Sequence, residues 1–260
     1  MLRSYIAIPL AIAYTIVTGI PALLLTACSP GSDFVLWFGR YWSRWILATA
    51  GVRLEASGRE NIEKGRPLVY LCNHQSNLDP LALVLTMPTS FRIVAKKFLF
   101  YIPIFGQCIW LMGMIPIDRE KRGSAIRSLK RAAERIRTGT SVLFFPEGTR
   151  SPDERLLPFK KGAFVIAVES GVPIIPVTIQ GSGRLLPKGS ALIRKGTMRI
   201  HYGRPIATVG YTLRTKEELM TRVREAMLAG LGQEESWPST PGAVRNGPES
   251  PLPAPASPVS

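Results

Sequence analysis

The N-terminal part of the chain is dominated by apolar positions. Residues 5–28 contain no charged side chain, and a helix of that length would cross a hydrocarbon core of roughly 30 Å. Pro9 and Pro21 interrupt the run, so a dipping helix or a bent pair also fits the pattern. We expect this segment to be a membrane anchor.

Two other interpretations of the same segment compete with an anchor. A cleaved signal peptide has a shorter apolar stretch and a more basic start than Arg3 alone. A bacterial lipoprotein signal would end at Cys28, since residues 25–28 resemble a lipobox, although so short a pattern arises often by chance. Arg40, Arg44 and Arg53 follow the segment, so the positive-inside rule predicts that the rest of the chain stays on the cytoplasmic side.

Residues 34–52 combine aromatic side chains with arginines. Arg40, Ser43 and Arg44 fall on one helical face at spacing i, i+3, i+4, and three of the five tryptophans lie within this segment. Aromatic and basic side chains suit the headgroup boundary, so we expect an amphipathic helix in the membrane interface. A core helix with two exposed arginines is the alternative.

Short apolar runs then alternate with helical periodicity. Runs typical of buried strands occupy residues 68–72, 92–95, 114–117, 142–145 and 174–179. Helices are indicated from residue 79 and over residues 124–137, 163–169 and 215–231, while the alternation in residues 198–202 predicts an edge strand. This order predicts an α/β fold, with a central mixed sheet flanked by helices and an N-terminal membrane-associated helical element.

Two of these helices begin with a recognisable signal. Asp79 followed by Pro80 is typical of a capping residue and a first helical position. Thr215 and Glu218 have the spacing of a capping box. Both signals place a helix start where the apolar periodicity also begins.

The last 28 residues differ in composition, because they hold seven of the 22 prolines. We predict that residues 233–260 form a disordered tail. The domains expected are therefore residues 1–52 as membrane-anchoring helices, residues 53–232 as the folded domain, and this tail.

The net charge of +15 predicts an anionic partner. Lipid headgroups, an acidic carrier and nucleic acid all qualify, but no helix-turn-helix or RNA-binding signature is evident, so we expect no nucleic acid. The three cysteines form no CxxC pair and no metal-type cluster, which argues against a metal site and for a reducing compartment.

His74 follows a predicted strand directly, and Asp79 lies five residues further on. A histidine can take a proton from an alcohol, and a carboxylate on its far nitrogen would fix the tautomer. Residues i and i+5 of a straight helix point about 140° apart, so the pair can meet only across a turn, which Asn73, Ser76 and Asn77 favour. In the alternative, Asp79 is only a helix cap and His74 only a turn residue.

Three other segments at strand or helix ends carry groups that can bind an anion. Gly148 permits close backbone approach, Thr149 offers a hydroxyl, and Arg150 can bind a phosphate with two hydrogen bonds. Arg119 follows another predicted strand, and Lys160 lies just before a helix N-terminus, which favours an anion. Each segment can equally be a plain turn with solvated charges.

Together these segments resemble the 1-acylglycerol-3-phosphate acyltransferase family over about residues 66–204. The family's four blocks occur in order at residues 73–79, 113–119, 145–151 and 172–177, and the first contains its His-x4-Asp signature. Lys96 and residues 158–162 also match. Pro116 departs from the pattern, because the family usually has a bulky apolar residue there.

The resemblance implies roles for individual residues. His74 would be the general base and Asp79 its orienting partner, in a direct attack on the acyl thioester without an acyl-enzyme. The acceptor phosphate site would comprise Arg119, Glu147, Gly148, Thr149 and Arg150, with Lys160 nearby. A carboxylate does not bind phosphate, so we expect Glu147 to hold Arg119, Arg150 or a substrate hydroxyl. The fourth block would support the donor side.

The resemblance also implies the partners and the compartment. No metal or cofactor is needed, and acyl-CoA or acyl carrier protein serves as co-substrate. The acceptor would be a lysophospholipid, 1-acylglycerol-3-phosphate, and the product phosphatidic acid. The protein is expected at the inner membrane, in contact with membrane lipid, with its catalytic domain on the cytoplasmic side.

Other functions remain open at this point. The same motifs also fit other acceptors, namely glycerol-3-phosphate, another lysophospholipid or a lyso-ornithine lipid. A thioesterase would use Cys72 as nucleophile, although a thiol inside an apolar run is more typical of a core residue. A non-catalytic basic membrane-binding protein is the third class. His201 is expected on an edge strand without a role.

Overall fold

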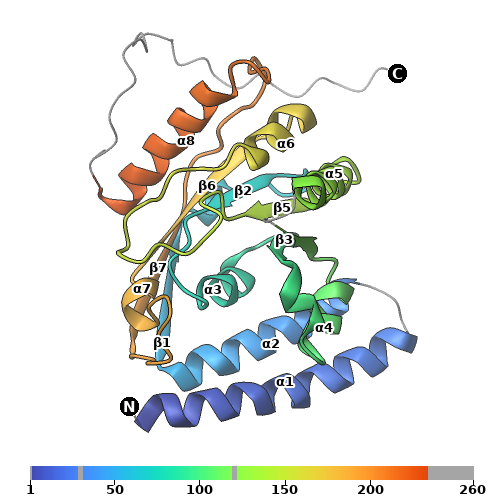
Figure 1. Cartoon of the computed structure of the whole chain (residues 1–260), viewed down its shortest axis with the longest axis vertical. Coiled ribbons are helices and arrows are strands. Elements are labelled where there is room, and N and C mark those ends of the chain that lie inside the picture. Colours follow the sequence, from blue (N-terminus) through green and yellow to red (C-terminus); the bar gives the residue numbers. More distant parts are fainter. Residues whose placement is uncertain (1, 29–31, 119–121, 234–260) are drawn as a thin grey trace.

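The computed structural model describes residues 2–28, 32–118 and 122–233. Seven strands form one sheet in the order β1-β7-β6-β2-β5-β3-β4 (Figure 1). The strands are β1 (Val52–Ser57), β2 (Val69–Cys72), β3 (Phe91–Lys96), β4 (Ile115–Ile117), β5 (Ser141–Phe144), β6 (Ile174–Gln180) and β7 (Gly196–Tyr202). β2 lies in the middle, and all four of its residues are buried.

The sheet is mixed, as the sequence predicts. β6, β2, β5, β3 and β4 are parallel to one another, whereas β7 is antiparallel to β6 and β1 is parallel to β7. The prediction that residues 198–202 form an edge strand is wrong, because β1 pairs with β7 from Gly196 to His201 and is itself the edge. β1 was not among the predicted strands.

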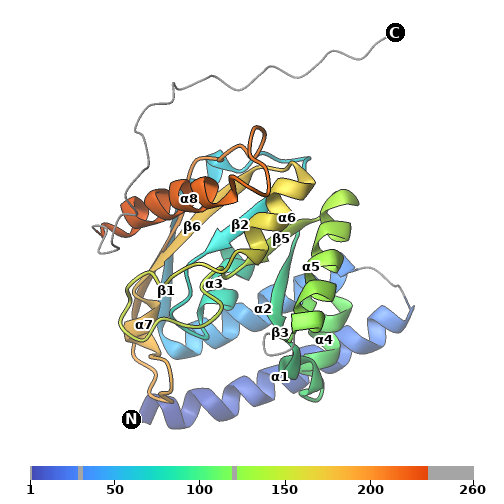
Figure 2. The ribbon, with the colours of Figure 1, turned by 45° about the horizontal axis from the view of Figure 1, so that its top comes forward.

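Helices cover both faces of the sheet (Figures 1 and 2). They are α1 (Leu2–Cys28), α2 (Ser32–Ala50), α3 (Asp79–Thr86), α4 (Phe105–Leu111), α5 (Arg122–Arg137), α6 (Gly162–Ser170), α7 (Ser182–Leu185) and α8 (Lys216–Leu231), with 3-10 turns η1 (Arg59–Asn61) and η2 (Lys97–Tyr101). α2, α3 and α4 share an apolar core with one face, and α5, α6 and α8 share another with the opposite face. The alternation of β2 explains this, since Tyr70 enters the first core and Leu71 the second.

α1 and α2 lie side by side in opposite directions beneath the sheet (Figure 1). α1 is one continuous helix despite Pro9 and Pro21. The Trp42 indole donates to Thr15 Oγ1 at 2.9 Å, and the rings of Tyr14 and Trp45 are 5.1 Å apart. Residues 4–25 are long and apolar enough to cross a membrane, and only 11% of the most apolar window is buried.

One side of the molecule exposes an unusual number of large apolar side chains, all from α1, α2, η2 or α4. They include Tyr5, Ile12, Val17, Leu24, Trp37, Trp45, Phe98, Tyr101 and Trp110, each at least 49% exposed. We call these residues the apolar face. α2 also contributes to the core through Val35 and Leu47. Ser43, expected on the polar side of this helix, is buried.

The final helix begins where predicted, but without the predicted cap. α8 starts at Lys216, directly after Thr215, yet no side chain caps its first turn. The Thr215 hydroxyl instead accepts a hydrogen bond from the backbone N–H of Thr212. The capping-box prediction is therefore wrong in its contacts although right in its position. Residues 234–260, predicted to be a tail, lie outside the described residues, as do the side chain of Cys28 and the lipobox interpretation that depends on it.

Candidate active site

The predicted site residues follow neighbouring parallel strands. β2 lies between β5 and β6 and is parallel to both, so the loops after these strands leave the sheet at the same edge. Leu71 pairs with Phe144 in register. The loop that carries His74 therefore lies beside the loop that carries Glu147.

His74 and Asp79 form a hydrogen-bonded pair in the loop after β2. Nδ1 of His74 lies 2.8 Å from Oδ2 of Asp79. The same oxygen accepts hydrogen bonds from the backbone N–H groups of Gln75 and Ser76, at 2.7 and 2.8 Å. These bonds close the turn that the sequence requires between the pair. Asp79 is therefore no helix cap: its oxygen binds residues before α3, and no side chain caps that helix.

The pair has an electrostatic asymmetry that suits a general base. Asp79 is fully buried, whereas the His74 side chain is 16% exposed. Because the carboxylate accepts the hydrogen bond, Nδ1 carries the proton and Nε2 keeps its lone pair. The ring of Phe145 stacks on the imidazole with centroids 4.1 Å apart. The imidazole is thus held on one side and available at Nε2.

Glu147 connects the main chains of the surrounding loops. Its Oε1 accepts a hydrogen bond from the backbone N–H of His74 at 2.7 Å, and its Oε2 accepts one from Leu157 at 2.9 Å. Among the described residues it forms no ion pair with Arg150, which was one of its expected roles. Glu147 is a positioning residue for His74 in this structure.

The environment of Glu147 opposes its ionisation. Burial raises the pKa of this carboxyl to about 7, the two backbone hydrogen bonds act against that rise, and the Asp79 carboxylate adds to it. Arg224 of α8 lies nearby and donates to the backbone oxygens of Leu156 and Leu157, at 3.0 and 2.9 Å. α8 therefore fixes the segment to which Glu147 binds.

The anion-binding candidates surround the loop after β5. Gly148 has a φ of 74°, and a Cβ there would meet Cε of Lys160 at 2.8 Å. The positive φ favours glycine here, whereas the flexible end of Lys160 could move aside for a Cβ. The Lys188 ammonium donates to Oγ1 of Thr149 at 3.2 Å, and Arg150 follows, half-buried.

Backbone hydrogen bonds connect this loop directly to the segment that carries His74 and Asp79. The backbone N–H of Ser151 donates to the carbonyl of His74 at 2.7 Å, and that of Lys160 donates to Pro146 at 2.8 Å. The cations of Lys160, Lys188 and Arg150 therefore belong to the same edge as His74. Arg119 lies outside the described residues, so its expected place in this site stays a prediction.

Several residues of the site were not predicted from the sequence. Lys188 comes from the segment between α7 and β7, and Arg224 from α8, so no local spacing connects either with His74. Asn73 was assigned only to a turn, yet its side chain pairs with both backbone groups of Ile179 on β6, at 2.7 and 2.9 Å. Phe145 belongs to the block at residues 145–151, but the sequence does not indicate that its ring stacks on His74.

Cys72 does not have the environment of a nucleophile. Its side chain is buried in the apolar core. Burial, together with the charges of Asp79 and Glu147, raises the pKa of the thiol well above its usual range. Because the thiolate is the reactive form, the position suits packing and not attack on a thioester.

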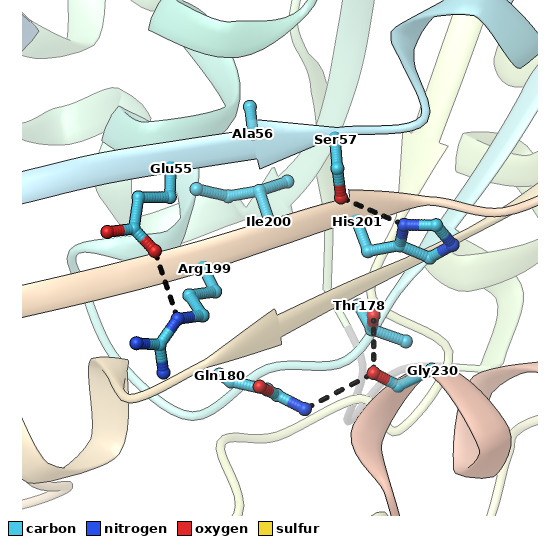
Figure 3. Close-up of a pocket in the computed structure, with 9 residues that line it drawn as sticks. All are labelled: Glu55, Ala56, Ser57, Thr178, Gln180, Arg199, Ile200, His201 and Gly230. Carbon is cyan, nitrogen blue, oxygen red and sulfur yellow. Dashed lines mark hydrogen bonds and ion pairs between the residues drawn. The ribbon is translucent and has the colours of Figure 1, made fainter.

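His201 lies in a different part of the sheet (Figure 3). It projects from β7 into a groove of about 310 Å³, where its Nδ1 lies 3.0 Å from Oγ of Ser57. Glu55 and Arg199 form an ion pair at 3.0 Å along the same strands. No described carboxylate orients the imidazole of His201, in contrast to His74.

The fold and the site together define an α/β protein in which a buried carboxylate holds a histidine beside a cationic loop. The model of the acyltransferase family matches residues 53–180. A chloroplastic 1-acyl-sn-glycerol-3-phosphate acyltransferase of Brassica napus is 38% identical over 75% of this chain, which spans 60% of that protein. A putative enzyme of the same name from Caenorhabditis elegans is 34% identical over 84% of this chain and 76% of its own length.

A solved structure agrees with these relatives. The crystal structure of the 1-acyl-sn-glycerophosphate (LPA) acyltransferase PlsC from Thermotoga maritima matches with a TM-score of 0.79 and 28% identity, over 89% of this chain and 94% of that one. The chain belongs to the 1-acyl-sn-glycerol-3-phosphate acyltransferase family. It spans about three fifths of the length of the Brassica napus relative.

Proposed function

We propose that this protein transfers a fatty acyl group from acyl-CoA or acyl carrier protein to the free hydroxyl of 1-acylglycerol-3-phosphate. The product would be phosphatidic acid, a precursor of phospholipids. The observation that carries the proposal is the hydrogen-bonded pair of His74 and Asp79 beside a cationic loop. The activity named for the relatives supports this acceptor.

The geometry suggests a single-displacement mechanism. Nε2 of His74 takes the proton from the acceptor hydroxyl while that oxygen attacks the thioester carbonyl. Asp79 stabilises the imidazolium that forms. The tetrahedral intermediate then expels the thiolate as the C–S bond breaks, and the imidazolium proton goes to that sulfur. No step uses a metal or a cofactor, and no acyl-enzyme forms.

The acceptor phosphate would bind the loop after β5. Arg150 can hold two phosphate oxygens, Lys160 and Lys188 add positive charge, and Thr149 keeps a hydroxyl proton to donate. Gly148 leaves room for the Lys160 side chain beside the backbone. Arg119 is proposed to complete this set. Glu147 acts indirectly, because it fixes the backbone of His74.

The apolar face would hold the enzyme on its lipid substrate. Tryptophan and tyrosine side chains are typical of the membrane interface, and α1 adds an apolar surface long enough to enter the bilayer. We place the protein on the inner membrane with its folded domain on the cytoplasmic side, where acyl thioesters are made. Nucleic acid has no part in this proposal.

Acyl transfer by detergent-purified protein tests the proposal. Labelled acyl-CoA or acyl carrier protein is mixed with 1-acylglycerol-3-phosphate, beside a folded His74→Ala variant. Phosphatidic acid from the wild type alone supports the reaction and the base together. Activity on another lysolipid but not on this acceptor would overturn the substrate and keep the chemistry. Equal activity of the wild type and the variant would overturn the base.

A further inference from the structure

α5 is the most basic helix of the fold, and its outer surface carries the positive charge. The helix contains six cations and a single carboxylate, Glu134, which pairs with Arg137 at 2.7 Å. Arg127, Lys130 and Arg131 are exposed and form no ion pair with a described residue. α8, which covers the same side of the sheet, has three cations and three carboxylates. Among the three helices on this face of the sheet, the excess positive charge therefore lies on α5.

This charge does not face the membrane side of the molecule. α5 packs with α6 and α8 on one face of the sheet, whereas the apolar face is built by helices on the other (Figure 2). Ionic attraction falls off within about 8 Å in physiological salt. Lipid headgroups at the apolar face thus give no reason for the cations of α5, and a soluble anionic partner does.

A groove of about 600 Å³ runs between α5 and α6 beside these cations. Ile126, which is 47% exposed, lines it together with Leu129, Ala133, Val165 and Ile166. Lys130 and Arg137 contribute positive charge to its rim, and Glu134 and Glu169 contribute negative charge. An apolar floor between charged side chains is the surface on which an amphipathic helix docks.

We propose that this surface, the α5 strip of Arg127, Lys130, Arg131 and the adjoining groove, docks an acidic helical protein that carries the acyl thioester. The inference rests on the proposed function and makes acyl carrier protein the donor that this chain recognises. The cations from Arg127 to Arg137 extend over about 15 Å of helix, which matches an acidic helix laid alongside better than the clustered phosphates of CoA.

The position of α5 suits delivery to the active site. β4 is parallel to β3, β3 to β5 and β5 to β2, so β4 ends at the same sheet edge as β2. α5 begins five residues after the end of β4, at Arg122. A carrier on the N-terminal half of α5 is therefore docked beside the edge that holds His74, from which its flexible arm can present the thioester.

Donor kinetics with a double charge reversal test the docking surface. Arg127→Glu with Arg131→Glu should raise the KM for acyl carrier protein about tenfold or more and leave the KM for acyl-CoA within about twofold. The matched control, Arg214→Glu with Arg222→Glu, changes the same charge on exposed positions at and before α8 and should leave both KM values unchanged. Thermal unfolding checks that all variants are folded.

Each alternative outcome has a defined meaning. An unchanged KM for acyl carrier protein overturns the inference, as does an equal rise in KM for both donors, which would assign the strip to CoA phosphates. Loss of binding to anionic vesicles would assign it to lipid. Transfer from acyl-CoA but never from the carrier overturns the inference and leaves the proposed function intact. If neither donor reacts, the docking surface is tested by direct titration of acyl carrier protein onto the wild type and both double variants. Docking on α5 predicts weaker binding only to the Arg127→Glu, Arg131→Glu variant, and equal binding to all three proteins overturns the inference.

Discussion

Asp79 determines the position of His74 as well as its tautomer, because one carboxylate oxygen accepts from the imidazole and from two backbone N–H groups. Asp79→Asn keeps an oxygen that can accept these bonds but removes the charge that would stabilise the imidazolium in the proposed mechanism. We expect kcat to fall roughly 10³- to 10⁴-fold, as in other histidine-carboxylate sites. Measurement of kcat beside circular dichroism checks this. A loss below tenfold in a folded variant would mean that the charge is dispensable.

Glu147 provides a test of positioning, because its two oxygens each accept a backbone hydrogen bond. Glu147→Gln leaves one acceptor and turns an N–H₂ group toward the second N–H. With a pKa of about 7, the wild-type carboxyl ionises between about pH 6 and pH 8. We expect wild-type kcat to rise in that window as the loop tightens, and the variant to be slower with a flatter profile.

The same pKa predicts the sign of a stability change. The folded protein holds a proton on Glu147 up to about pH 7, whereas the unfolded chain releases it near the ordinary value of 4.5. The folded state therefore binds more protons in this window, and this group lowers the free energy of unfolding as pH rises from 4.5 to 7. Denaturant unfolding of the wild type and Glu147→Gln across the window measures the difference. Identical slopes would contradict the raised pKa.

At the scale of elements, α1 should decide whether the protein stays on a membrane. Val17 and Leu24 are 69% and 65% exposed on this helix. A lysine in the membrane costs about 2.5 kcal/mol or more at the helix centre, so the double variant with both residues changed to Lys should move from the pellet to the supernatant in vesicle sedimentation. Val209→Lys, at a position 82% exposed between β7 and α8, is the matched control. Equal pelleting of all three proteins would exclude α1 as the contact.

The elements also show what a single sequence can predict. The buried strands were found because their apolar runs are continuous, as in β2 and β5, and the order of elements then gave the mixed α/β fold. β7 was wrongly predicted to be the edge strand. Alternating polar and apolar residues show only that one face of a strand is exposed, which is true of β7, but they do not show that β1 pairs with it. Polar and apolar residues alternate in β1 as well, but the strand was not recognised because Arg53 and Glu55 make the segment look like a charged loop. Lys188 and Arg224 reach the site from distant segments, which spacing cannot reveal.

At the scale of the whole molecule, the two sides of the sheet are expected to serve different partners. Trp110 of α4 is 59% exposed, and α4 touches α1 where the Cys108 thiol lies 3.8 Å from the Gly19 carbonyl. If the apolar face works as one surface, a residue far from α1 in sequence must also contribute to membrane binding. Trp110→Lys should then weaken binding to anionic vesicles about tenfold, because it exchanges an interfacial anchor for a hydrated charge.

The opposite side supplies the control for this last prediction. Ile126→Lys places the same charge on α5, at a residue that is 47% exposed, and should leave vesicle binding unchanged. Both variants replace exposed side chains, so their melting temperatures should stay close to that of the wild type. A Trp110→Lys variant with undiminished affinity would confine the membrane contact to α1 and α2. A similar loss in Ile126→Lys would mean that α5 also faces lipid, and the division of the molecule into a membrane side and a carrier side would fail.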